Sequence, residues 1–276
     1  MICFNRPDEN RLMPFANPFM PMENVVEPNA IEIHDLWFSY GAQTVLEDVN
    51  LAIRRNEFLA VIGPNGGGKT TLIRLILGIL HPDRGVIRVF GEAPEKTARH
   101  MGYVPQNTHL NKEFPISVLD VTLMGRLGRV GRAWRYSPKD KGMAEKALDR
   151  VGMLSYRDTP INNLSGGQRQ RVFIARALVT EPDILFMDEP TASVDTEWQA
   201  NIYTLLKELN ETVTIVVVSH DISVLSSHVK SVACVNRTVF YHDSTEITME
   251  MLEKMYQCPV ELIAHGLPHR VLGKHK

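Results

Sequence analysis

Three observations predict an α/β protein built on a mainly parallel sheet. Short apolar runs alternate with helical segments near both ends of the chain, which is the order expected of a parallel sheet flanked by helices. A mostly helical block at about residues 107–180 separates these two α/β parts. A glycine-rich turn also joins a buried strand directly to a helix, and turns of that kind bind phosphate groups.

The first regular elements are two strands, at residues 31–36 and 49–53, in which apolar and polar residues alternate. This alternation is typical of strands with one buried face. Residues 1–29 are rich in proline and asparagine and lack the apolar region of a signal peptide. We expect them to form a disordered extension, and we expect the folded domain to span residues 30–245.

The next strand, at residues 58–62, leads into the P-loop pattern G-x-x-x-x-G-K-[ST] and then into a helix expected to reach Leu80. The glycines let successive backbone N–H groups turn toward phosphate oxygens, and the helix N-terminus adds its positive dipole end. Lys69 is expected to contact the β- and γ-phosphates, and Thr70 to ligate Mg²⁺. A purely structural turn is the alternative, but these flanking elements favour a nucleoside triphosphate. The pattern comprises Gly63, Pro64, Asn65, Gly66, Gly67, Gly68, Lys69, Thr70 and Thr71.

Two short strands, at 86–90 and 101–104, complete the first α/β part, and the helical block follows with helices expected at 118–126, 140–152 and 166–179. Ser165 is placed to cap the last of these helices, and the glycines after it permit close approach to the backbone. This helix start is therefore a candidate for a second anion site. Its residues are Ser165, Gly166, Gly167 and Gln168.

A run of four apolar residues at 184–187 predicts a buried strand, and Asp188 and Glu189 follow at its carboxyl end, where ligands of parallel sheets bind. Asp188 is suited to hold Mg²⁺, usually through water. Glu189 is expected to face the opposite way and to act as a general base on water. Two solvated loop acids are the alternative. A helix at 196–209 and strands at 212–219 and 229–235 complete the domain.

The composition is that of an ordinary globular protein, with 276 residues, 44% hydrophobic and 22% charged. Thirty Lys and Arg against 32 Asp and Glu give a net charge of −2, which offers no argument for a nucleic-acid partner. Cys3, Cys234 and Cys258 are isolated, so neither a disulfide framework nor a cysteine metal site is expected. No apolar run approaches the ~20 residues that span a bilayer. If the protein acts at a membrane, we therefore expect it to do so through a partner protein.

In this order, the motifs resemble those of ABC-transporter nucleotide-binding subunits, and the similarity covers about residues 31–241. The resemblance implies a RecA-like P-loop NTPase core, an antiparallel β subdomain and an inserted helical subdomain. It also implies that Tyr40 stacks on adenine and that Gln106 is the Q-loop glutamine, acting in catalysis and on Mg²⁺. Asp195 would belong to the D-loop, and His220 would be the switch histidine at the γ-phosphate. Taken singly, each of these residues is also compatible with a purely structural role.

In that family, two subunits face each other head to tail. ATP binds between the P-loop of one copy and the helix start at Ser165 of the other. The resemblance therefore implies a dimer that uses ATP and Mg²⁺. The catalytic residues that it implies are Glu189, His220, Gln106 and Lys69.

The segments F-P-I-S-V at 114–118 and L-M-G-R at 123–126 resemble those of zinc and manganese importers. This likeness implies a peripheral subunit on the cytoplasmic face of the membrane, an integral membrane permease and, indirectly, an extracytoplasmic metal-binding protein. The C-terminal tail at 246–276 contains His265 and His269. Gly266 and Pro268 lie between them and oppose a helical metal-binding pair, so we expect these histidines to be packing residues.

Two other functions stay open. Importers of iron chelates or other small solutes share parts of the same segments. A soluble ABC ATPase acting on ribosomes or DNA is the second alternative. Three features of the sequence argue against this second alternative: a single ATPase unit, no long coiled-coil insertion and no excess of basic residues.

Overall fold

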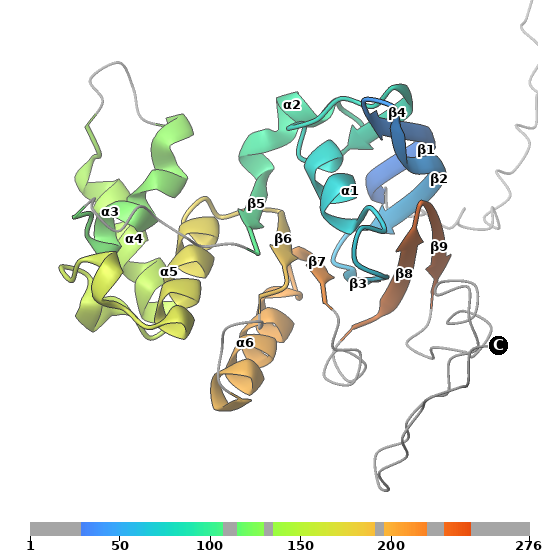
Figure 1. Cartoon of the computed structure of the whole chain (residues 1–276). Coiled ribbons are helices and arrows are strands. Elements are labelled where there is room, and N and C mark those ends of the chain that lie inside the picture. The colour runs from blue at the N-terminus through green and yellow to red at the C-terminus, as the bar shows by residue number, and fades with distance from the viewer. Residues whose placement is uncertain (1–28, 107–114, 130–134, 191–195, 220–228, 244–276) are drawn as a thin grey trace, which may run out of the picture.

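The computed structural model describes residues 29–106, 115–129, 135–190, 196–219 and 229–243 (Figure 1). It consists of a three-stranded antiparallel sheet, a six-stranded sheet that is mostly parallel, and a group of helices beside the parallel sheet. The predicted α/β class is therefore confirmed. His220, Asp195, residues 107–114 and the tail histidines lie outside the described residues.

The antiparallel sheet has the strand order β2-β1-β4 and is formed by β1 (Asn29–Tyr40), β2 (Gln43–Arg54) and β4 (Arg84–Val89). The strands predicted at 31–36 and 49–53 are confirmed but are longer than expected. They extend because β1 and β2 form a hairpin that is paired from Asn29↔Arg54 to Tyr40↔Gln43.

The larger sheet has the order β5-β6-β7-β3-β8-β9. Its first five strands are parallel, and β9 pairs with β8 in the antiparallel sense. The β9 strand was not predicted: it is an edge strand that follows a tight turn at Arg237, whose φ is 60°. The strands are β5 (Met101–Val104), β6 (Ile184–Asp188), β7 (Thr214–Val218), β3 (Phe58–Ile62), β8 (Ser231–Asn236) and β9 (Thr238–His242).

Both faces of the parallel sheet are buried, and successive residues of a strand enter different cores. In β6, Leu185 and Met187 pack into the core shared with the helical group. Ile184 and Phe186 pack into the core shared with α1 (Lys69–Ile76) and the antiparallel sheet. This two-sided burial explains why the central strands are continuous apolar runs.

The sequence predicted that this helix would reach Leu80, but α1 ends at Ile76. Gly78 adopts φ 71°, and its N–H donates to the carbonyl of Leu75 while the N–H of Ile79 donates to that of Arg74. This pair of hydrogen bonds closes a helix through a left-handed residue, a conformation that glycine adopts without a steric penalty.

The helical group contains α3 (Val118–Leu123), the 3₁₀ segment η2 (Met124–Arg129), α4 (Pro138–Arg150) and α5 (Gly166–Leu178). The helix predicted at 118–126 is therefore α-helical only to Leu123. The predicted helix at 196–209 is confirmed as α6 (Thr196–Leu209). The shorter turns are α2 (Pro94–Thr97), η1 (Ala98–His100), η3 (Leu154–Tyr156) and η4 (Ile161–Asn163).

A buried ion pair joins three parts of the helical group. The guanidinium of Arg126, which is 6% exposed, lies 2.9 Å from the carboxylate of Asp140 at the start of α4. Its Nη1 also donates to the carbonyl of Val179 after α5, at 3.4 Å. Because a buried charge is stable only when it is paired, this contact fixes how η2, α4 and α5 pack together.

Asp140 predicts a specific acid sensitivity. Hydrogen bonds from the side chain and backbone of Ser137, aided by Arg126, lower the pKa of Asp140 from 3.8 to about 2. A carboxyl group with a lowered pKa in the folded state contributes stability that is present above its unfolded pKa and lost as the pH falls through its folded pKa. We expect the melting temperature of Asp140→Asn to fall less steeply than that of the wild type between pH 4 and 2. Parallel slopes in that range would contradict the assignment.

Candidate nucleotide site

The P-loop lies at the carboxyl end of β3 and leads into α1. The loop also packs closely against β8. A Cβ on Gly67 would lie 2.8 Å from the carbonyl oxygen of Val235 in that strand. The sequence argument assigned this glycine only to phosphate approach. The structure adds that Gly67 packs closely against β8, so a Cβ at this position would require the loop or β8 to shift.

Lys69, the first residue of α1, is 7% exposed, and its side chain lies along the loop. Its Nζ donates to the carbonyls of Gly63 at 2.8 Å and Pro64 at 2.9 Å. Burial lowers the pKa of Lys69, while the carboxylates of Glu189 and Asp188 act to raise it. The ammonium group of Lys69 therefore lies at the P-loop, where it interacts electrostatically with the carboxylates of Glu189 and Asp188.

Thr70 and Asp188 meet directly. The hydroxyl of Thr70 donates to a carboxylate oxygen of Asp188 at 2.8 Å, and Asp188 is 2% exposed at the end of β6. Burial raises the pKa of Asp188, and the hydrogen bond from Thr70 opposes that change. A hydroxyl and a carboxylate are the hard oxygen donors that Mg²⁺ prefers, so these two side chains fit a magnesium ion.

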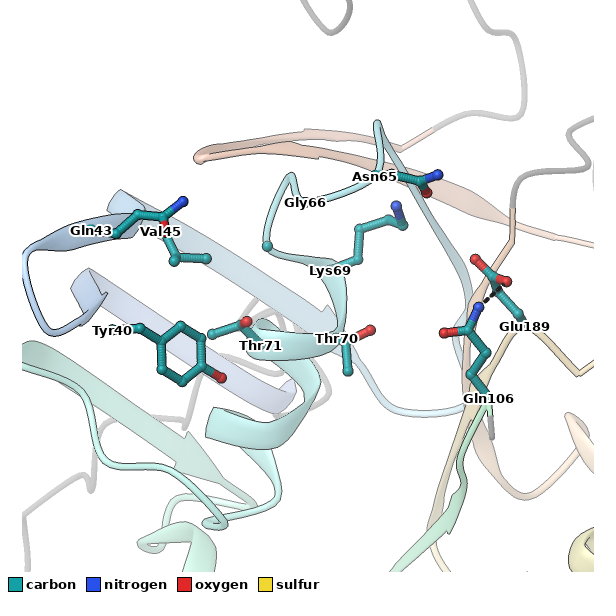
Figure 2. A pocket seen from close by; sticks show the side chains of 11 residues that line it. Tyr40, Gln43, Val45, Asn65, Gly66, Lys69, Thr70, Thr71, Gln106 and Glu189 are labelled. Atoms are coloured by element: carbon teal, nitrogen blue, oxygen red, sulfur yellow. Dashed lines mark hydrogen bonds between the residues drawn. The ribbon is translucent and has the colours of Figure 1, made fainter. Parts of the chain in front are cut away.

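Gln106 and Glu189 form the opposite wall of the site. The strand register pairs Val104 of β5 with Met187 of β6, so the residues two positions beyond this pair, Gln106 and Glu189, come together. The amide of Gln106 donates to the carboxylate of Glu189 at 2.5 Å (Figure 2). The backbone N–H of Glu189 donates to the carbonyl of Val218, and its φ is 50°. Asp188 and Glu189 thus contact different partners, Thr70 and Gln106 respectively.

A cavity of about 340 Å³ brings nine of the predicted residues together. Tyr40, at the end of the β1–β2 hairpin, lines one side and is 46% exposed, and its ring meets that of Phe38 edge-on at 4.9 Å. Glu189 and Gln106 line the other side (Figure 2). The other predicted residues that line it are Asn65, Gly66, Gly68, Lys69, Thr70 and Thr71.

Gln43 and Val45 also line this cavity and were missed by the sequence argument. A signal for them did exist: a hairpin that turns after Tyr40 pairs this residue with Gln43, which places the start of β2 next to the aromatic ring.

Ser165 and the residues after it are not among those that line the cavity. They open α5, which lies with α3 and α4 and away from α1 (Figure 1). The predicted cap is present: the Ser165 hydroxyl accepts from the N–H of Gln168 at 3.2 Å, and the Gln168 side chain accepts from the N–H of Ser165 at 2.9 Å. The helix start is thus preformed but separated from the P-loop of its own chain.

The P-loop beside a buried strand that ends in Asp188 defines the class of this fold as a P-loop nucleotide-binding protein. Residues 46–192 match the family model described as ABC transporter. The chain belongs to the ABC transporter family and contains its ATPase domain.

Several relatives are similar to this chain over most of their length. The chain is 41% identical over 229 residues to the manganese transport system ATP-binding protein MntB of Bacillus subtilis, an alignment that covers 82% of this chain and 92% of MntB. It is 40% identical over 230 residues to the zinc transport system ATP-binding protein TroB of Treponema pallidum, with 82% of this chain and 86% of TroB covered.

A solved structure supports the same fold. The ATP-binding cassette MJ0796, in a dimeric post-hydrolysis state bound to ADP and Pi, matches with a TM-score of 0.68 and 28% identity, covering 77% of this chain and 98% of that one. In the described part of this chain, no helix has the length and apolar character needed to cross a membrane. Nor do the described residues contain a group of three or more His, Cys, Asp or Glu arranged for a metal ion.

Proposed function

We propose that this chain is the ATP-binding and ATP-hydrolysing subunit of an ABC importer that powers uptake of a divalent transition metal, zinc or manganese, through a membrane permease. The observation that carries the ATPase part is the convergence of Lys69, Thr70 and Glu189 on one cavity beside Asp188. The metal part rests on the relatives, which are named as manganese and zinc transport proteins.

The residues divide the chemistry among them. The P-loop N–H groups and Lys69 would bind the β- and γ-phosphates, and Tyr40 would stack on the base. Thr70 and Asp188 would hold Mg²⁺, with Gln106 nearby, and that ion would neutralise charge on the phosphates. Glu189 would accept a proton from the water that attacks the γ-phosphate. His220 and Asp195, which lie outside the described residues, stay predictions at the same site.

The active site would be completed by a second copy of the chain. The preformed helix start at Ser165 is separated from its own P-loop, and a preformed helix N-terminus favours an anion. In a head-to-tail dimer this helix start would face the γ-phosphate held by the partner's P-loop. The dimeric state of the similar MJ0796 cassette supports this arrangement.

The assignment implies a peripheral position on the cytoplasmic face of the membrane, with the permease contacting the chain just past Gln106. An extracytoplasmic metal-binding protein would deliver the metal, and no nucleic acid would take part. The domain limits, 30–245 with a helical subdomain at about 107–180 and tails on both sides, belong to the same proposal.

Metal uptake by cells tests the substrate. In a strain that lacks this gene, accumulation of zinc or manganese is expected to fall, and the wild-type gene is expected to restore it. Lys69→Ala is expected not to restore it, because the phosphates lose their cation. Accumulation of an iron chelate should stay unchanged in all strains. Loss of iron-chelate uptake with normal zinc and manganese uptake would establish the alternative importer instead.

A further inference from the structure

A second cavity, of about 630 Å³, lies at the opposite edge of the parallel sheet. The nucleotide site follows the carboxyl ends of β3, β5 and β6, whereas this second cavity precedes their amino ends. Arg55 stands three residues before β3, His100 directly before β5, and Asp183 directly before β6. We call it the amino-edge cavity.

Four side chains form a continuous arc along its wall. The guanidinium of Arg55 lies over the ring of Phe90, 4.7 Å from the centroid, and this ring meets His100 edge-on at 6.2 Å. The Nε of Arg99 then donates to the Nε2 of His100 at 3.1 Å. The arc therefore has a guanidinium group at each end, and contacts along its length restrict both groups.

Hydrogen bonds on both sides orient the histidine ring. An arginine N–H can only donate, so Nε2 of His100 accepts the hydrogen bond from Arg99. Nδ1 donates to the Oδ2 of Asp183 at 2.6 Å. The register that pairs Met101 with Ile184 places these two side chains side by side. His100 is therefore held in orientation by its neighbours on both sides.

The charges that line the cavity leave an excess of positive charge. Three cations, Arg55, Lys96 and Arg99, stand against two carboxylates, Glu92 and Asp183, so three minus two gives +1. Glu92 is paired with Lys96 at 3.0 Å, and Asp183 accepts from His100. Among the described residues, neither Arg55 nor Arg99 has a carboxylate partner. Two guanidinium groups thus retain N–H donors that can bind an anion.

A tight turn holds Phe90 on this wall of the cavity. Phe90 has φ 52°, a left-handed conformation that is uncommon for a bulky residue, and Gly91 continues the turn with φ 80°. The N–H of Phe90 donates to the carbonyl of Ala30 at 2.9 Å, which holds the turn in place. Reciprocal backbone hydrogen bonds between Val89 and Glu92, at 2.8 and 3.0 Å, close this two-residue turn, so the φ values of Phe90 and Gly91 follow from the turn itself.

We propose that the amino-edge cavity binds a phosphate group, either free phosphate or the phosphate of an anionic lipid headgroup. Planar guanidinium groups donate in a fork that matches phosphate oxygens, and the arc offers one such group at each end. The site is distinct from the P-loop because it lies at the other edge of the sheet. It requires neither ATP hydrolysis nor metal transport.

Binding of inorganic phosphate tests the site directly. The full chain is first saturated with Mg²⁺ and a non-hydrolysable ATP analogue, so that the P-loop is not available to phosphate, and is then titrated calorimetrically. Arg55→Gln and Arg99→Gln are each expected to weaken phosphate binding about ten-fold or more, the scale of a lost charge-assisted hydrogen bond. Lys141→Gln, which removes one exposed cation from α4, is the matched control and should bind normally. Melting temperature and basal ATPase activity of all three variants should stay near those of the wild type.

A second arm of the experiment identifies the source of the phosphate group. The same proteins are sedimented with phosphatidylglycerol vesicles and with phosphatidylcholine vesicles. If only vesicle binding depends on Arg55 and Arg99, the ligand is a lipid headgroup. If only phosphate binding depends on them, the ligand is free phosphate. The proposal is overturned if the wild type binds neither probe, or if Lys141→Gln weakens binding as much as the two arginine variants do.

Discussion

Replacing Glu189 by glutamine is expected to lower steady-state ATP hydrolysis by about 10²–10⁴-fold, the usual contribution of a general base, while ATP binding is retained. The amide has nearly the shape of the carboxylate but cannot accept a proton from water. The P-loop, Lys69 and the Thr70–Asp188 contact are unchanged by this substitution. The variant should also accumulate a stable ATP-bound dimer.

Glu181→Gln is a suitable control for this experiment. Glu181 has the same φ of 50° as Glu189 but is exposed after α5 and does not line the nucleotide cavity. Turnover and ATP affinity are measured for both variants with Mg-ATP. Turnover of Glu189→Gln close to that of the wild type would mean that another group accepts the proton.

Ser165→Arg is expected to abolish ATP-dependent dimerisation. The long cationic side chain would occupy the position that should receive the γ-phosphate bound to the partner's P-loop. Ser165 does not line the cavity of its own chain, so the nucleotide affinity of the monomer should hardly change. Light scattering with and without ATP, in the hydrolysis-deficient Glu189→Gln background, measures the loss.

Ser137→Arg separates this effect from the loss of a helix cap. Ser137 begins α4 with the same capping box that Ser165 forms at α5, so each substitution should lower stability by about 1 kcal/mol. Only Ser165→Arg should prevent dimerisation. If both variants dimerise normally with ATP, the shared site is excluded. If neither dimerises, the loss reflects the damaged cap.

The α/β class, most of the elements and the chemical groups at the ends of β3 and β6 could all be predicted from the amino-acid sequence. These features depend on local patterns. Apolar runs long enough for a strand, a P-loop spacing between a strand and a helix, and a serine before a helix can each be recognised from neighbouring residues. For the same reason Lys69, Thr70, Asp188 and Glu189 could be predicted as one site, since carboxyl ends of parallel strands meet at one edge.

The contacts between residues far apart in the chain depend on how the strands and helices pack in three dimensions. The β5–β6 register brings Gln106 to Glu189 and His100 to Asp183, and β8 packs closely against Gly67. Arg126 likewise reaches Asp140 from a different element. Strand register and packing follow from the joint burial of many side chains, so no local pattern in the sequence specifies these contacts.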